Sequence, residues 1–211
     1  MSNKQSILVW DFPIRVFHWL LVVCFAGAWL TSESERLQMI HYAFGYSACA
    51  LVIFRLVWGL IGTKYARFTQ FIKGPKQILI HFKGALSSNH ATVGHNPAGG
   101  LVMVALMLII LLIGLTGYWS VKEFLGDFMS GVHETIASLA LALVIIHIAA
   151  AIVMSLLQKE NLVRAMVDGK KQGLPEQAIR FPQYLIGFLL MLGWGYIFYL
   201  IVSGSMPALT Q

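Results

Sequence analysis

Long apolar runs separated by short polar stretches dominate the chain. A helix that crosses the ~30 Å hydrocarbon core of a bilayer needs about 20 mainly apolar residues. Pro13 and Pro97 suit the first turns of two such runs, and Asp11 or Asn96 precedes each proline closely enough to cap the helix. Five runs reach the required length, at residues 13–30, 40–61, 97–119, 132–157 and 184–202. The pattern predicts an all-α integral membrane bundle of five transmembrane helices.

Composition agrees with a membrane protein. Of the 211 residues, 58% are hydrophobic and 11% are charged, whereas a soluble protein has ~25% charged residues. An ordinary water-soluble fold is therefore excluded. Seven histidines accompany only nine acidic residues, so histidine is prominent among the groups that can bind a metal or move a proton.

The basic residues are distributed unequally between the two sides of the predicted membrane. Arg36 and Lys122 fall on one side, and twelve fall on the other: Lys4, Arg15, Lys64, Arg67, Lys73, Lys76, Lys83, Lys159, Arg164, Lys170, Lys171 and Arg180. Because cytoplasmic loops are enriched in Lys and Arg, we expect a cytoplasmic N-terminus and an external C-terminus. The net charge of +6 is then a topology signal and not a nucleic-acid footprint.

Three local features allow a simpler interpretation. Residues 26–28 (Ala-Gly-Ala) imitate a signal-peptide cleavage site, but cleavage would discard His18 and no basic segment precedes this span. Residues 76–83 fit either a helix along the membrane surface or a solvated basic linker. Cys24 and Cys49 lie in apolar runs without a C-x-x-C motif, and we expect each to be a small buried hydrophobic residue.

Four histidines lie inside predicted spans, where an ionisable side chain normally serves a site. His133 and His147 are fourteen residues apart in one span, so both project from the same helix face about 21 Å apart. His147 lies about 8 Å from the cytoplasmic boundary, and so does His18. His41 begins a span that enters from outside, level with His133.

The depths therefore define an inner pair, His18 and His147, and an outer pair, His41 and His133. A single intramembrane histidine is more often a hydrogen-bonded packing residue than a ligand. Four at matched depths favour ligation, because two six-coordinate haems need two pairs of axial imidazoles at separate depths. His133-Glu134 is not a zinc-protease motif, because Ala137 stands where the second histidine is required.

Two further residues fit haem, each with an open alternative. Arg55 follows His41 by fourteen residues and could reach the propionates of the inner haem; the alternative is that it snorkels to the inner headgroups. Gly45, one turn after His41, would allow a flat macrocycle to approach; the alternative is close helix packing.

Taken together, several motifs resemble the bacterial cytochrome b-561 and nickel-iron-hydrogenase cytochrome b family. The resemblance runs from about residue 9 to 170. The motifs are Trp10-Asp11-x-Pro13-x-Arg15-x-x-His18-Trp19, His41-x-x-x-Gly45-Tyr46, Phe54-Arg55-x-x-Trp58-Gly59, Gly94-His95-Asn96-Pro97-x-Gly99-Gly100, and Val132-His133-Glu134 with His147.

The resemblance implies that the first, second and fourth helices ligate two non-covalent b-type haems through the same two histidine pairs. It also implies electron transfer across the bacterial inner membrane, between a quinone and a periplasmic redox protein such as a c-type cytochrome or a dehydrogenase or hydrogenase subunit. His95 belongs to one motif; it either contacts a propionate or quinone or begins a helix facing headgroups. His81 and His90, in the inner loop, are expected to be solvated.

The domain prediction follows: a di-haem core over residues 1–182 and an additional transmembrane helix over 183–211. Two other functions compete with electron transfer. One is a stand-alone oxidoreductase of the same family that acts on a small substrate such as superoxide. The other is a histidine-based transition-metal transporter, which the scarcity of intramembrane carboxylates disfavours.

Overall fold

Five long helices form the body of the molecule. The computed structural model describes residues 4–71, 93–94 and 97–210. The helices are α1 (Phe12–Thr31), α2 (Gln38–Ile61), α4 (Pro97–Val121), α5 (Asp127–Gln158) and α7 (Tyr184–Val202). Each is long and apolar enough to cross a membrane. The prediction of an all-α bundle with five spans is confirmed, although α5 begins five residues earlier than its apolar run.

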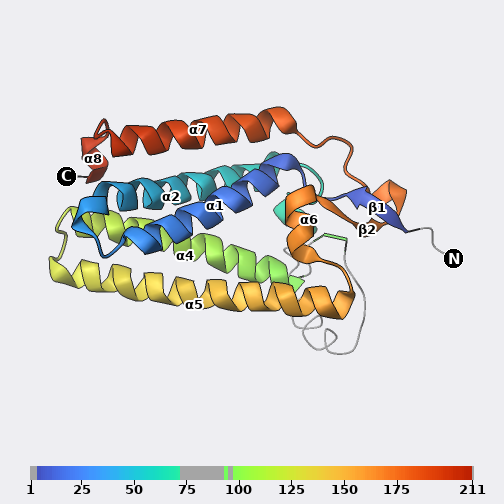
Figure 1. The fold of residues 1–211 in the computed structure, drawn as a ribbon, viewed down its shortest axis with the longest axis horizontal. Helices are drawn as coiled ribbons and strands as arrows, with labels where there is room; N and C mark the ends of the chain where they lie inside the picture. The colour runs from blue at the N-terminus through green and yellow to red at the C-terminus, as the bar shows by residue number, and fades with distance from the viewer. Residues whose placement is uncertain (1–3, 72–92, 95–96, 211) are drawn as a thin grey trace.

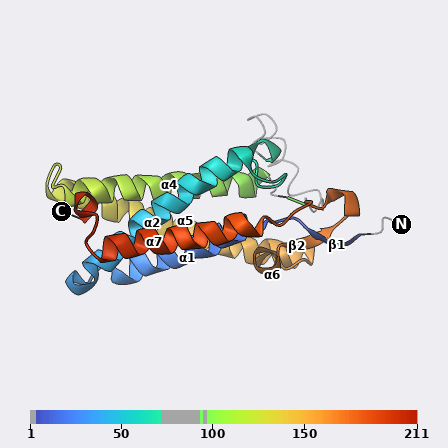
Figure 2. The ribbon, with the colours of Figure 1, turned by 90° about the horizontal axis from the view of Figure 1, so that it is seen from above.

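The helices lie in layers (Figures 1 and 2). α1 and α2 pack against each other in the middle, α7 covers them on one side, and α4 and α5 pair on the other side. α2 contacts α1, α4 and α7. It is therefore the helix that joins the layers.

Aromatic contacts hold α7 against α1. The ring of Phe12 lies 5.3 Å from the rings of both Tyr184 and Phe188. Deeper in the span, the indole N–H of Trp194 donates to Sγ of Cys24 at 3.2 Å. Cys24 is fully buried and not disulfide-bonded, as the sequence analysis expected. The separate domain status of residues 183–211 stays a prediction.

The two ends of the bundle differ in architecture (Figure 1). At the end near the N-terminus lie α6 (Leu162–Asp168) and an antiparallel ribbon of β1 (Gln5–Leu8) and β2 (Lys170–Gly173). Short 3-10 turns η2 (Phe68–Gln70) and η3 (Pro175–Gln177) accompany the helices. The opposite end holds η1 (Glu35–Leu37), the α4–α5 loop at 122–126 and α8 (Pro207–Thr210). By the Lys and Arg count, we expect the ribbon end to be cytoplasmic.

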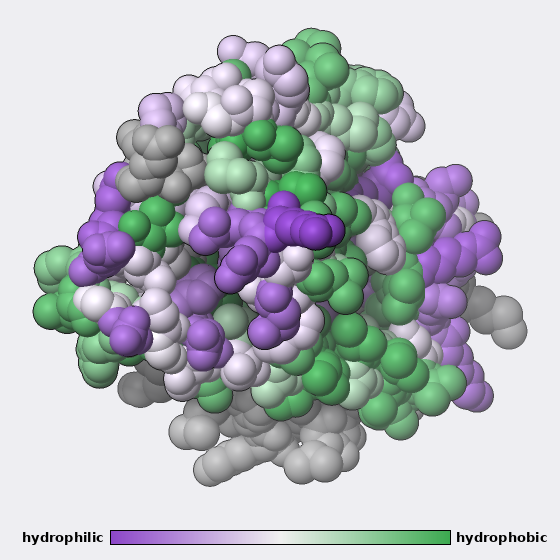
Figure 3. Space-filling view, turned by 60° about the vertical axis from the view of Figure 1, so that its left-hand side comes forward, coloured by the Kyte–Doolittle hydropathy of each residue, from purple (hydrophilic) through white to green (hydrophobic). Residues whose placement is uncertain are grey.

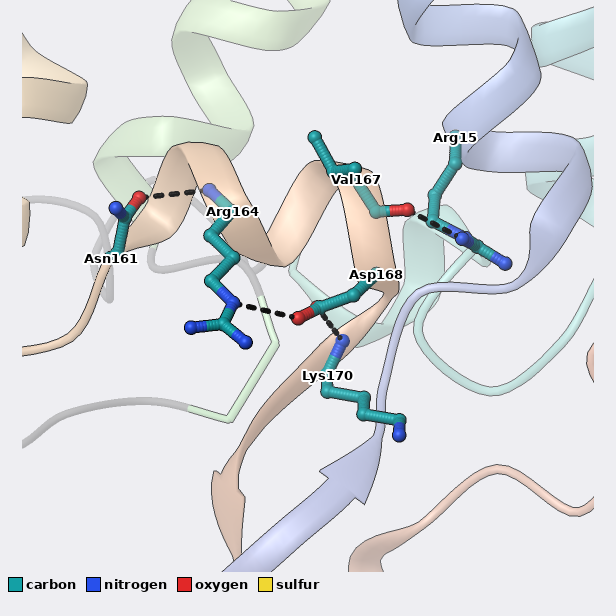
Figure 4. Close-up of polar contacts among 6 residues, drawn as sticks. All are labelled: Arg15, Asn161, Arg164, Val167, Asp168 and Lys170. Atoms are coloured by element: carbon teal, nitrogen blue, oxygen red, sulfur yellow. Dashed lines mark hydrogen bonds and ion pairs between the residues drawn. The ribbon is translucent and has the colours of Figure 1, made fainter.

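α6 is fixed to α1 through its last carbonyls (Figure 4). The Asn161 side chain caps its N-terminus. At its other end, Nη1 of Arg15 donates to the carbonyl of Val167 at 2.6 Å, and Nε1 of Trp19 donates to that of Met166 at 3.0 Å. A cation at a helix C-terminus is favourable because the last carbonyls carry partial negative charge.

β2 brings a buried charge pair to the same end. Nζ of Lys171 lies 3.5 Å from Oε2 of Glu160, and the Lys171 side chain is only 5% exposed. Burial lowers the pKa of Lys171, while the Glu160 carboxylate acts in the opposite direction. Lys171 therefore anchors the ribbon together with Ile7, which is buried on β1.

Asp11 connects three segments at the ribbon end. Its Oδ1 accepts from the backbone N–H of Ile14 at 2.9 Å and caps α1. Its Oδ2 accepts from Nε1 of Trp58 at 3.0 Å and from the hydroxyl of Thr63 at 2.6 Å. Asp11 is 1% exposed. The start of α1, the end of α2 and the turn after α2 thus share one buried carboxylate.

Asp11→Ala is expected to lower the free energy of unfolding by about 2–4 kcal/mol, because it removes the helix cap and leaves two buried donors unpaired. Asp11→Asn retains a capping oxygen and should cost less. Unfolding in detergent followed by circular dichroism measures both. Asp127→Ala, at an exposed acid in the first turn of α5, is the control, and equal losses for Asp11→Ala and the control would contradict this role of Asp11.

Candidate functional site

The structure brings the outer pair of histidines together. His41 lies near the start of α2 and His133 near the start of α5. Their ring centroids are 6.2 Å apart, and the ring planes are inclined at 78°. An imidazole nitrogen binds a transition metal such as zinc at about 2.0–2.1 Å, so two such bonds in line place ring centroids roughly 6 Å apart. The separation matches two axial ligands of one metal ion.

Hydrogen bonds orient both rings of the outer pair. Nδ1 of His41 lies 2.8 Å from the carbonyl oxygen of Ala28 on α1, and Nδ1 of His133 lies 3.0 Å from that of Ile113 on α4. A carbonyl can only accept, so each Nδ1 is the protonated nitrogen. Nε2 of each ring is then left with its lone pair, the arrangement typical of a metal-ligating histidine.

The inner pair lies at the opposite depth. His18 is on α1 and His147 is on α5, and both residues are half-buried. Within the described residues, Nδ1 of His18 is buried without a hydrogen-bond partner. Among the described residues, His18 therefore lacks the carbonyl contact that orients each ring of the outer pair.

Arg55 is a buried cation at the inner depth. Its residue exposure is 1%, its Nη2 donates to the carbonyl of Ala66 at 2.9 Å, and its guanidinium lies 4.9 Å from the centre of the Phe68 ring. The snorkelling interpretation is therefore wrong, because α4 and the turn after α2 enclose the side chain. Nη1 is buried with no partner among the described residues. A buried cation with a free donor suits a carboxylate ligand.

Space is open beside the outer pair. A Cβ built on Gly45 would meet no heavy atom within 4 Å. Among the described residues, no heavy atom of a neighbouring helix lies within 4 Å of this position, so the close helix packing considered for Gly45 is not observed. The open face lies one turn from His41, where a flat ring bound at the histidine would extend.

Some predicted features fall outside the described residues. His95, His81, His90 and the segment 76–83 belong to this group, and their roles stay predictions.

The donor set fits haem better than a bare metal ion. Within residues 4–71, 93–94 and 97–210, no three His, Cys, Asp or Glu side chains converge as a metal site. Two protein ligands suffice for haem, because the porphyrin supplies the other four. The paired imidazoles of His41 and His133 and the open space at Gly45 fit an iron porphyrin, and the free donor of Arg55 would suit a propionate.

The sequence analysis missed the groups that orient these ligands. Ala28 and Ile113 act through backbone carbonyls, which have no side-chain signature. Two threonines offered a partial signal: Thr31 and Thr116 are polar residues within apolar spans, and each donates to the carbonyl that accepts from a histidine.

Comparisons with known proteins identify the family of this chain. Residues 9–169 match the family model described as prokaryotic cytochrome b561. The chain is 23% identical over 143 residues to the probable Ni/Fe-hydrogenase 1 B-type cytochrome subunit of Escherichia coli strain K12, a match that covers 56% of this chain and 61% of that protein. It is 22% identical over 216 aligned positions to the probable Ni/Fe-hydrogenase B-type cytochrome subunit of Rhizobium leguminosarum bv. viciae, covering 80% of this chain and 90% of that protein.

The chain thus spans about three fifths of the length of the Escherichia coli relative. No solved structure matches the chain significantly.

Proposed function

Because the chain belongs to the prokaryotic cytochrome b561 family, we propose that it is a di-haem cytochrome that transfers electrons across the bacterial inner membrane. Membrane electron transfer by a multi-pass protein with haem b is the general property of this family. The proposal for this chain is more specific: two haems, a quinone on the cytoplasmic side and a redox protein on the outer side. The observation that carries it is the His41–His133 pair, with ring centroids 6.2 Å apart and both Nδ1 atoms bonded to carbonyls.

Each histidine has a defined task in this proposal. His41 and His133 hold the outer haem, and His18 and His147 hold the inner one. Bound haem iron supplies one-electron chemistry. Along α5, His133 and His147 are separated by a rise of about 21 Å, so haems held there would lie at two separate depths.

The quinone is placed at the inner depth. His147, Arg55 and His95 are the ionisable groups assigned there, and Arg55 has a buried donor with no partner among the described residues. A guanidinium N–H can donate to a quinone oxygen or to a propionate. The proposed quinone site therefore lies next to the inner haem, where protons can be exchanged with the cytoplasm.

The outer partner is assigned to the acidic loops. Residues 33–36 and 123–127 lie at the same end of the bundle, beside the outer pair. Figure 3 brings this end forward and shows hydrophilic side chains gathered on it beside a hydrophobic flank. The names of the relatives support a hydrogenase subunit as partner; another dehydrogenase subunit or a c-type cytochrome would fit the same surface.

The histidine pairing is tested by single substitutions. His41→Ala and His133→Ala should each remove the outer haem and retain the inner one, and His18→Ala and His147→Ala should do the reverse. Haem content per chain and the reduced visible spectrum of each purified variant measure this. Glu134→Ala, next to His133 but exposed, should keep both haems. If His18→Ala and His41→Ala deplete the same haem, the pairing is wrong.

Arg55→Leu should retain both haems and lower the midpoint potential of the inner one, because a nearby positive charge favours the electron-rich reduced state. It should also slow reduction by a quinol analogue. Redox titration and stopped-flow absorbance measure the two effects. Arg55→Lys keeps the charge but loses the planar guanidinium. Compared with Arg55→Leu, it should restore the midpoint potential of the inner haem more fully than the rate of reduction by the quinol analogue. Unchanged potential and rate in Arg55→Leu would eliminate this site.

Docking at the acidic loops predicts salt-dependent electron exchange. With a basic c-type cytochrome as probe, the rate should fall as ionic strength rises, since salt screens attraction between exposed charges. Replacing Glu123 and Asp127 by Gln and Asn should slow exchange at low salt and flatten the salt dependence. The same replacements at Glu176 and Asp168, at the other end of the bundle, are the control. A salt-independent rate in the unmodified protein would eliminate electrostatic docking.

A further inference from the structure

The third span, α4, carries none of the proposed ligands. It nevertheless contacts the ring of His133 through a backbone carbonyl, a hydroxyl and a glycine. The carbonyl of Ile113 lies 3.0 Å from Nδ1 of His133. The hydroxyl of Thr116 lies 3.4 Å from the same nitrogen, and Thr116 is only 5% exposed. The contact is therefore shielded from lipid and water.

Gly117 leaves the space that this ring occupies. A Cβ at position 117 would lie 3.0 Å from Cε1 and 3.2 Å from Nδ1 of His133. Both distances are shorter than ordinary van der Waals contact. A side chain here would require the imidazole to shift by a few tenths of an ångström, so the glycine lets the ring lie at its present distance from the carbonyl of Ile113.

Thr116 also acts on the acceptor carbonyl. Its hydroxyl lies 2.9 Å from the carbonyl of Leu112 and 3.1 Å from that of Ile113. Back-bonding of a threonine hydroxyl to carbonyls of the preceding turn bends a helix locally. The carbonyl of Ile113 thus accepts from Thr116 on its own helix and from His133 on α5.

The same arrangement recurs at the other outer ligand. Thr31 donates to the carbonyls of Gly27 and Ala28 at 2.7 and 3.3 Å, and the carbonyl of Ala28 accepts from Nδ1 of His41. A threonine three residues after the acceptor carbonyl is therefore present on α1 as on α4. Two helices from different parts of the chain therefore make the same hydrogen-bond pattern with the two outer imidazoles.

We propose that Thr116 and Gly117 on α4, with Thr31 on α1, are positioning residues of the outer haem site. They fix both imidazoles with the proton on Nδ1 and leave each Nε2 with its lone pair free to bind iron. A hydrogen bond donated by Nδ1 makes the imidazole a more basic ligand through Nε2. A more basic ligand favours ferric iron, so the midpoint potential of the outer haem is lowered. This inference rests on the proposed function, because it requires an outer haem.

The decisive variant is Gly117→Val, with Gly131→Val as its matched control. Gly131 lies on α5 two residues before His133, and a Cβ there would meet nothing within 4 Å. Gly117→Val should weaken haem binding at the outer site about 10-fold, the effect typical of losing an outer-shell partner, and leave the inner haem unchanged. Gly131→Val should keep both. Haem titration of each variant, followed by absorbance, is the measurement.

Thr116 is tested without crowding the site. Thr116→Val should keep both haems, raise the midpoint potential of the outer one and shift its ferric EPR signal, and Thr116→Ser should restore both readouts. A merely structural hydroxyl would change neither. Gly117→Val and Thr116→Val proteins with an outer site like that of the unmodified protein would overturn the inference, and so would equal loss of both haems in Gly117→Val.

The unmodified protein separates this inference from the proposed function. Two haems per chain are expected, and their presence is required before the variants are compared. Fewer than two would contradict the di-haem proposal itself. Two haems with unaffected variants would contradict only the positioning role of Thr116 and Gly117.

Discussion

Every polar group inside a bilayer must find its partner within the protein, because hydrocarbon offers none. Helix formation satisfies the backbone, so the few polar side chains in these spans need other partners. His41 and His133 find them in the carbonyls of Ala28 and Ile113. Those bonds consume one nitrogen of each ring and leave the other nitrogen available. The constraint that satisfies the protein thus also leaves two adjacent imidazoles, each with one unprotonated nitrogen.

The same constraint explains the ribbon end. Asp11 is buried and is satisfied by a backbone N–H, an indole N–H and a hydroxyl from three separate segments. Because these donors come from α1, α2 and the turn after α2, the carboxylate fixes how the first two helices meet. His18 follows Asp11 by two turns on α1, and Arg55 precedes Trp58 by one turn on α2. The depth of both inner groups therefore depends on the Asp11 contacts.

The sequence predicts features that follow from the length of apolar runs and the spacing of residues along a helix. It does not predict features that depend on tertiary contacts. Five spans follow from the lengths of apolar runs, and the meeting of His41 with His133 follows from their equal depth. The burial of Arg55 does not follow, because it requires Phe68 and Ala66 to fold back over α2 from the next turn. The ribbon is likewise missed, since β1 and β2 are separated by four of the five spans and neither strand is longer than four residues. Backbone acceptors such as Ile113 leave no mark on the sequence at all.

The two depths therefore differ in how completely the protein satisfies its own groups. At the outer depth, both Nδ1 atoms are bonded, and threonines hold the acceptor carbonyls. At the inner depth, Nδ1 of His18 and Nη1 of Arg55 have no partner among the described residues. Unpaired buried donors cost free energy unless a ligand accepts from them. This difference fits the proposed function. At the outer depth, the helices set the geometry of the two imidazoles. At the inner depth, polar groups remain available to carboxylate or quinone oxygens.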